Sequence, residues 1–138
     1  MNKAEPILDV AAGNLVAFKR DKACGHCSYC IDGWETLCES QENSGYSVDG
    51  AWAEYAVAFD SHVVTVPEAV SSLDAAPLAC AGVTTFHRGT RKDLADVFAL
   101  HAAGRTKVIA QERHLDDVNL CIEEVLSGQV PARLVFTF

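Results

Sequence analysis

The second half of the chain repeats apolar residues with a helical period. Three such residues, Leu94, Val97 and Phe98, lie on one face of a helix by their spacing, and His101 continues the same face at i+7. Thr90 and Asp93 have the spacing of a capping box, and Gly104 is a typical helix stop. The pattern therefore predicts an amphipathic helix over residues 90–104 with a buried apolar face.

Two further helices are predicted over residues 74–87 and 116–127. Start signals from Ser71 onward precede the first of them. It contains Pro77, which an α-helix tolerates in its first turn because the missing N–H has no partner there. The second has apolar residues that predict a buried stripe: Val118, Cys121, Ile122 and Val125.

Strand-type composition marks residues 51–66 and 132–138, with a shorter candidate at 107–110. Residues 1–22 contain two short apolar runs around a turn-forming segment, which predicts a β-hairpin of unassigned origin. Strands at both ends of a helical region favour an α+β fold. The length of 138 residues predicts a single domain over residues 1–138.

Composition narrows the classes of partner and the compartment. The net charge of −8 argues against nucleic acid and anionic membranes, which both need a basic surface. No run of eighteen apolar residues predicts a membrane span. The first residues do not have the pattern of a signal peptide, so we expect a reducing, cytoplasmic location.

Four cysteines supply the most specific chemistry. They follow the spacing C-x2-C-x2-C-x7-C at Cys24, Cys27, Cys30 and Cys38. Four thiols so close can wrap one tetrahedral Zn²⁺ with protein ligands alone, which is a closed structural site. The alternative is a disulfide cluster, which a reducing compartment disfavours. We therefore predict a loop-rich zinc lobe over residues 23–48, with Gly25 and Gly33 in its tight turns.

Three stretches resemble the zinc-dependent medium-chain alcohol dehydrogenases, especially the bacterial propanol-preferring type. The cysteine segment "CGHCSYCIDGWETLC" resembles that family's structural-zinc lobe. Residues 45–86 resemble the end of its GroES-like catalytic domain, so residues 49–86 are expected to be a GroES-like remnant. Residues 87–138 resemble the C-terminal segment that returns from the cofactor domain. The resemblance implies a partial GroES-like sheet or barrel with three short helices.

The departures from the family are as informative. The chain has no "C-G-x-C-H-T-D" or "G-H-E" motif, which in the family supply two catalytic-zinc ligands, and residues 1–22 show no counterpart of that region. It also has no G-x-G-x-x-G, the dinucleotide-binding fingerprint. We therefore interpret the chain as a truncated dehydrogenase and do not expect it to bind NAD.

By the resemblance, Cys80 stands where the family has its third catalytic-zinc ligand. His87, seven residues later, is the candidate second ligand if the helix persists. Thr84 stands at a family position near the nicotinamide, and Arg133 at a cofactor-pyrophosphate position. Without the cofactor domain, we interpret Thr84 and Arg133 as family positions that no longer have a cofactor to bind. We interpret Cys80 as either a buried apolar residue or a metal ligand.

Three functions remain open from the sequence. The first is a zinc-binding remnant of an alcohol dehydrogenase, an oxidoreductase by ancestry that does not oxidise alcohols alone. The second is a small zinc-dependent hydrolase of the esterase or lactonase kind, acting on a small molecule near Cys80. The third is an oligomeric binding module. Apolar faces on helices 74–87 and 90–104 predict a homo-oligomer. The sequence does not decide whether the chain is an enzyme.

Overall fold

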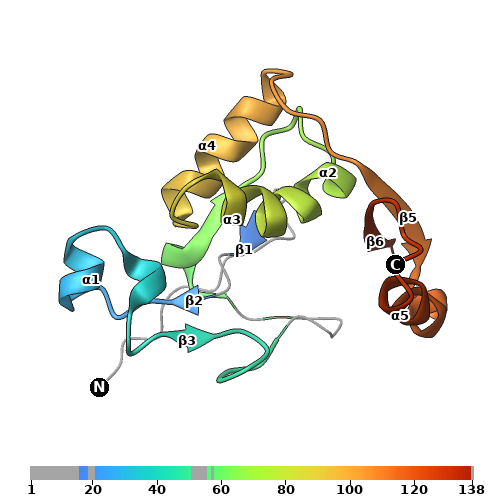
Figure 1. Cartoon of the computed structure of the whole chain (residues 1–138). Coiled ribbons are helices and arrows are strands. Elements are labelled where there is room, and N and C mark those ends of the chain that lie inside the picture. Colours follow the sequence, from blue (N-terminus) through green and yellow to red (C-terminus); the bar gives the residue numbers. More distant parts are fainter. Residues whose placement is uncertain (1–15, 19–20, 51–55, 57, 138) are drawn as a thin grey trace.

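The structure, a computed structural model, describes residues 16–18, 21–50, 56 and 58–137 (Figure 1). The elements run in the order β1 (Val16–Phe18), β2 (Asp21–Lys22), α1 (Ser28–Ile31), η2 (Glu35–Leu37), β3 (Glu42–Asn43), η3 (Asp60–His62), β4 (Val63–Thr65), α2 (Ser72–Pro77), η4 (Leu78–Gly82), α3 (Val83–Phe86), α4 (Arg91–Ala102), β5 (Ala110–His114), η5 (Leu115–Asp117), α5 (Val118–Leu126) and β6 (Arg133–Thr137). Helices α2 to α4 lie together, while α5 forms a group with β5 and β6 (Figure 1). The predicted α+β class is confirmed.

The described strands form three small sheets of two strands each. Strands β1 and β4 pair antiparallel, as do β2 and β3, whereas β5 and β6 pair in parallel. The second run of the predicted N-terminal hairpin therefore pairs with β4, and its first run lies outside the described residues. Within the predicted strand over 51–66, Val63–Thr65 is a strand, but Asp60–His62 forms a 3-10 turn, which corrects the prediction there. Residues 51–55 and 57 lie outside the described residues. The strand predicted at 132–138 is confirmed as β6.

The core lies where α4 crosses β4 and the helical segment 72–86. Phe98 is fully buried, and Leu94 and Val97 are 2% and 4% exposed, which confirms the predicted apolar face of α4. Val64 of β4 belongs to the same cluster. Gly82 allows a close approach, because an added Cβ would lie 3.4 Å from the Val97 side chain.

The predicted capping box is also confirmed. The Thr90 hydroxyl accepts a bond from the backbone N–H of Asp93, and the Asp93 carboxylate accepts one from the backbone N–H of Thr90. Both bonds satisfy N–H groups that have no partner inside the helix. At the other end of α4, Gly104 has a φ of 68°, the left-handed conformation expected after a helix.

The helix that contains Pro77 differs from the prediction. Ser71 caps α2 by accepting from the N–H of Asp74, so Pro77 is the sixth residue of the helix and not in its first turn. Proline cannot donate to the carbonyl four residues earlier, and its ring crowds that carbonyl. The chain continues in the wider π-helical turn η4 before α3 ends at Phe86.

The C-terminal part also needs two corrections. The strand predicted at 107–110 lies instead at Ala110–His114. The predicted buried stripe of α5 holds for Cys121, which is 2% exposed, but not for Ile122 and Val125, which are 52% and 53% exposed. The short turn η5 is the main neighbour of α5 among the described elements, so much of the apolar stripe stays in solvent. No described helix is both long and apolar enough to cross a membrane.

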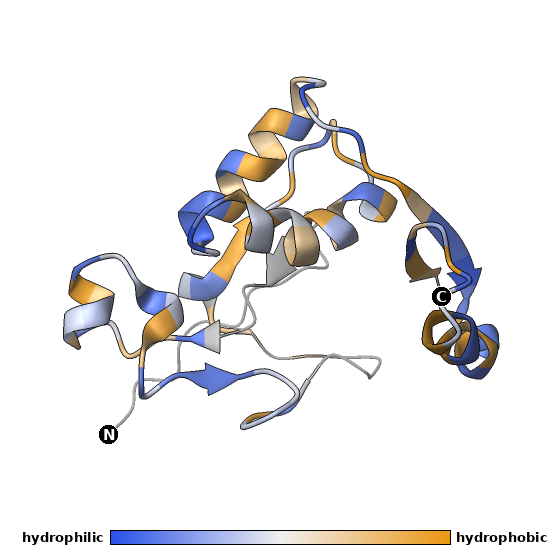
Figure 2. Cartoon of the chain, viewed as in Figure 1, coloured by the Kyte–Doolittle hydropathy of each residue, from blue (hydrophilic) through white to orange (hydrophobic). Residues whose placement is uncertain are grey.

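The exposed apolar surface predicted for helices 74–87 and 90–104 lies elsewhere in the structure. On the described helices 72–86 and 91–102, only Phe86 is of this kind, at 44% exposure. The zinc lobe and α5 expose more, including Leu126 at 82%. Figure 2 shows apolar residues on one side of α5. The predicted homo-oligomer stays a prediction, and its expected apolar surface moves to these elements.

Candidate metal centre and the adjoining groove

The four cysteines are placed by one short loop and two single helical turns. Cys27 precedes α1 and Cys30 lies within it, while Cys38 directly follows η2. Gly25 and Gly33 have φ values of 79° and 76°, which confirms that the turns on either side of α1 need glycine. Residues three apart lie on the same face of a helical turn, so Cys27 and Cys30 point in the same direction.

The four sulfurs converge. All lie within 4.8 Å of one another, with 3.9 Å between the Sγ atoms of Cys24 and Cys30 and 3.5 Å between those of Cys27 and Cys30. A regular tetrahedron with Zn–S bonds of about 2.3 Å has S–S edges of about 3.8 Å. The donor set and its spacing therefore fit zinc.

Backbone donors around the cluster favour the thiolate of Cys24, whereas burial disfavours that of Cys30. The N–H of Cys24 donates to the sulfur of Cys38 at 3.3 Å, and the N–H of Cys27 donates to the sulfur of Cys24 at 3.4 Å. Backbone N–H groups of His26 and Cys27 lower the pKa of the Cys24 thiol to about 6. Burial raises the pKa of Cys30 to about 12. Metal binding would therefore displace protons from the cluster.

His26 lies beside the cluster without joining it. Its Nδ1 atom is 2.8 Å from the carbonyl oxygen of Cys24, and its side chain is exposed. Among the residues that the structure describes, the four cysteines form the one group of three or more His, Cys, Asp or Glu side chains whose ligand atoms converge.

The other predicted site residues are not assembled into such a group. Cys80 lies in η4 and is exposed, so the buried apolar interpretation is wrong. The helix ends at Phe86, and the π-helical turn changes the angular relation between Cys80 and His87 that a regular α-helix would give. The His87 ring faces a different partner, with Nδ1 3.4 Å from Oδ1 of Asp93. Their catalytic role stays a prediction.

Thr84 and Arg133 occupy ordinary structural positions. The Thr84 hydroxyl donates to the carbonyl of Cys80 at 2.7 Å, a bond within the helical segment. Arg133 opens β6 with its side chain exposed, and its backbone N–H donates to the carbonyl of Ile109. Neither observation tests the cofactor positions that the resemblance implies.

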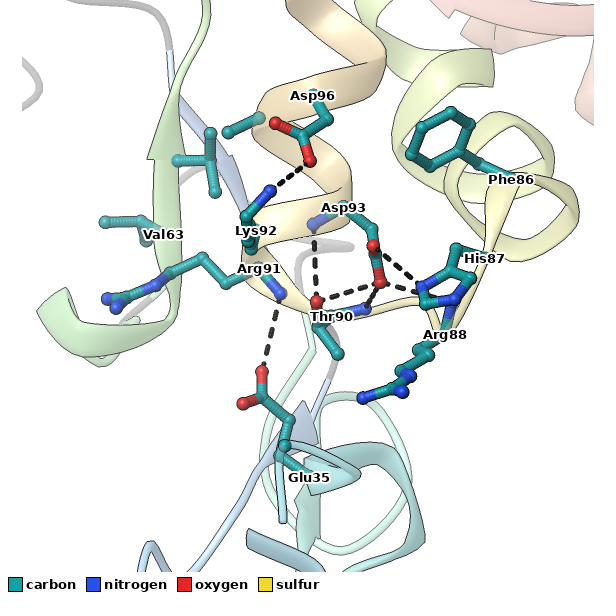
Figure 3. Close-up of a pocket in the computed structure, with 13 residues that line it drawn as sticks. Glu35, Val63, Phe86, His87, Arg88, Thr90, Arg91, Lys92, Asp93 and Asp96 are labelled. Carbon is teal, nitrogen blue, oxygen red and sulfur yellow. Dashed lines mark hydrogen bonds and ion pairs between the residues drawn. The ribbon is translucent and has the colours of Figure 1, made fainter. Parts of the chain in front are cut away.

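A groove of ≈ 980 Å³ lies next to the zinc lobe (Figure 3). Its lining comes from the zinc lobe, β4, the connection after α3 and the first turns of α4. The connection is fastened to the lobe, because the Thr36 hydroxyl donates to the carbonyl of Arg88 at 3.1 Å. The Arg88 guanidinium carbon also lies 4.1 Å from the centroid of the Trp34 ring.

Sequence reasoning missed this groove. Trp34 and Arg88 are far apart in the chain, and no spacing rule links a residue of a metal lobe to one in a helix connection. The capping box was the only local signal, since Thr90 and Asp93 are among the residues that line the groove (Figure 3). Its burial favours the neutral carboxyl, but bonds from Thr90 and Arg88 outweigh burial and hold the pKa of Asp93 below its usual range.

Comparison with known proteins identifies the N-terminal half. Residues 4–68 match the alcohol dehydrogenase GroES-like domain. Over 64 residues the chain is 59% identical to an alcohol dehydrogenase of Moraxella sp. (strain TAE123) and 59% identical to one of Geobacillus stearothermophilus. Each alignment covers 46% of this chain and 19% of the relative, so the matched segment spans about a fifth of those proteins.

The chain was also compared with a solved structure of a short chain alcohol dehydrogenase from E. coli CFT073, complexed with NADH. The alignment covers 88% of this chain and 40% of the other chain, with 22% sequence identity and a TM-score of 0.44. The family match begins at residue 4, so it takes in most of residues 1–22, for which the motifs gave no counterpart. Residues 4–68 are therefore similar to the GroES-like domain of alcohol dehydrogenases.

Proposed function

We propose that Cys24, Cys27, Cys30 and Cys38 hold one structural zinc that stabilises the zinc lobe. The convergence of the four sulfurs carries this proposal. Four protein ligands complete a tetrahedral shell and leave no position for substrate or water. When bound, the metal would cross-link the loop and would take no part in a reaction.

The packing of the lobe supports a structural role. Among residues 22–50, Cys38 alone is buried, and large apolar side chains such as Ile31 and Tyr46 are 73% and 88% exposed. The lobe therefore has almost no apolar core to stabilise it. In small elements of this kind the free energy of metal binding replaces burial of apolar surface.

At the level of the chain, we propose a zinc-stabilised remnant of an alcohol dehydrogenase, cytoplasmic and without alcohol oxidation or NAD binding of its own. The relatives named as alcohol dehydrogenases are about five times longer than the matched segment. Hydride transfer requires a nicotinamide held against the substrate. In the described residues, the hydroxyl of Thr84 is already bonded to a backbone carbonyl and Cys80 has no converging group of ligands.

Metal analysis combined with enzyme assays tests this proposal. We expect one zinc per chain, loss of the folded state when a chelator removes it, and no NAD-dependent oxidation of ethanol or propanol. Alcohol oxidation at an ordinary dehydrogenase rate would overturn the remnant. A second zinc, or a zinc whose removal abolishes ester or lactone hydrolysis without unfolding, would support the hydrolase predicted near Cys80 instead.

A further inference from the structure

The groove beside the zinc lobe has a mixture of charged side chains, and its acidic members are already bonded. The Asp93 carboxylate accepts from the N–H of Thr90 at 2.9 Å, from the Thr90 hydroxyl at 2.8 Å and from the N–H of Arg88 at 3.1 Å. Asp96 pairs with Lys92 at 2.6 Å. The Glu35 carboxylate accepts from the N–H of Arg91 at 3.4 Å.

The basic members are different, because one guanidinium has no acceptor. The Nε atom of Arg88 is buried and has no hydrogen-bond partner, and no carboxylate among the described residues forms an ion pair with this side chain. Arg91, by contrast, donates from Nη1 to the carbonyl of Ser61. The Trp34 ring faces the charge but accepts no hydrogen bond from Nε, and a buried N–H group without an acceptor is costly, which points to an acceptor from outside the chain.

Arg88 is also held in place before any ligand arrives. Its N–H and carbonyl are both bonded, to Asp93 and Thr36, and its guanidinium plane lies against the Trp34 ring. A Cβ added at Gly33 would lie 3.7 Å from Nη1 of Arg88, an ordinary contact distance, so the guanidinium lies close to this turn of the zinc lobe. A fixed guanidinium loses less entropy on binding than a free side chain.

We propose that this groove binds a small molecule through an oxyanion, a carboxylate or a phosphate, held by the guanidinium of Arg88. The planar fork of arginine donors matches either group with two parallel hydrogen bonds. The helix N-terminus is not needed for this site, because the N–H groups of Thr90, Arg91 and Asp93 already donate to side chains of the protein. The rest of the ligand lies along the groove between His87, whose side chain is 59% exposed, and the half-exposed ring of Phe86.

The volume agrees with a ligand of this size. Sites for small molecules are clefts of about 300–1,000 Å³ with few polar groups. The groove, at ≈ 980 Å³, is at the upper end of that range. This inference does not depend on the proposed remnant function, since neither the zinc cysteines nor Cys80 lines the groove.

The resonance of the Arg88 Nε–H group tests the proposal directly. The zinc-loaded chain is titrated separately with sodium phosphate and sodium propionate at constant ionic strength, and the side-chain N–H signals of the arginines are followed by NMR. We expect a saturable shift of the Arg88 signal with at least one anion. The signal of Arg105, an exposed arginine at the other end of α4, is expected to stay fixed. No saturable shift of the Arg88 signal with either anion, or shifts of equal size at both arginines, would overturn the proposal.

Two variants complete the test. Arg88→Lys keeps the positive charge on Trp34 but loses the fork, so we expect binding at least tenfold weaker. Arg105→Gln is the matched control and should bind as the unmodified chain does. Equal affinity in Arg88→Lys would overturn the proposal. If that variant does not fold, the Arg88 signal of the unmodified chain decides. Zinc content measured on the same samples shows separately whether the metal proposal holds.

Discussion

Thr90 and Asp93 bond to each other in both directions at the start of α4, and Asp93 extends the contact to the N–H of Arg88 at 3.1 Å. One carboxylate therefore fixes both the first turn of the helix and the connection that precedes it. We expect Asp93→Asn to lower the free energy of unfolding by about 1–2 kcal/mol, since a cap and a charge-assisted bond are lost together.

The effect of Asp93 must depend on pH. Its pKa is lowered in the folded state from the usual 3.8. The stabilisation is therefore present in full above the unfolded-state pKa and is lost as pH falls through that value toward the lower folded pKa. Urea unfolding at pH values from 7 to 2 should show the difference from Asp93→Asn shrinking below about pH 4. A difference constant with pH would contradict this assignment.

The control for this variant is Asp96→Asn on the same helix. Asp96 pairs with Lys92, whose side chain is 82% exposed. Exposed pairs of this kind contribute little to stability, so we expect Asp96→Asn to lose less than Asp93→Asn. A larger loss in Asp96→Asn than in Asp93→Asn would show that the helix start is not the important site.

Removing one zinc ligand should abolish folding of the lobe. Binding of a structural zinc contributes about 10–16 kcal/mol in small zinc modules, which is comparable to the whole stability of a domain, about 5–15 kcal/mol. We expect Cys38→Ser to lose bound zinc and the cooperative melting transition, as measured by metal analysis and circular dichroism. Cys80→Ser changes an exposed thiol outside the cluster and should retain both. An unchanged melting curve in Cys38→Ser would refute the structural role.

The contact between Trp34 and Arg88 joins the lobe to the helical part and can be measured. A double-mutant cycle of Trp34→Ala and Arg88→Ala isolates the interaction from the other effects of each change. We expect a coupling free energy of about 0.5–1 kcal/mol, as for other cation–π pairs that are partly in solvent. Strictly additive losses would mean that the two side chains touch without stabilising the fold.

We expect the interface of the predicted homo-oligomer to lie at the exposed apolar side chains of α5. Leu120 and Leu126 are 55% and 82% exposed, and a second copy of the chain would cover them. Light scattering is expected to give twice the 14.8 kDa of one chain, and Leu126→Glu should shift the mass toward 14.8 kDa. A mass of one chain at every concentration tested would exclude this interface.

Local patterns predicted the structure well where neighbours in sequence are also neighbours in space. The capping box, the buried face of α4 and the convergence of four cysteines all depend on short spacings. The predictions failed where residues distant in sequence determine the burial or the contacts of a side chain. Ile122 and Val125 are apolar but exposed, because the elements that pack against α5 are not encoded in the helix. The stacking of Arg88 on Trp34 depends on the docking of two segments that no local pattern connects.

The parallel pair β5–β6 closes a short stretch of chain through α5, and outside that stretch its main contacts among the described elements are with α2. The pair β1–β4 instead joins residues 16–18 to residues 63–65 and requires most of the N-terminal half to be in place. We therefore expect the β5–α5–β6 segment and the part joined by the β1–β4 pair to unfold locally as separate cooperative units, with different free energies of opening. Amide hydrogens of β5 and α5 should therefore exchange with solvent earlier than those around Phe98, without unfolding of the rest of the chain.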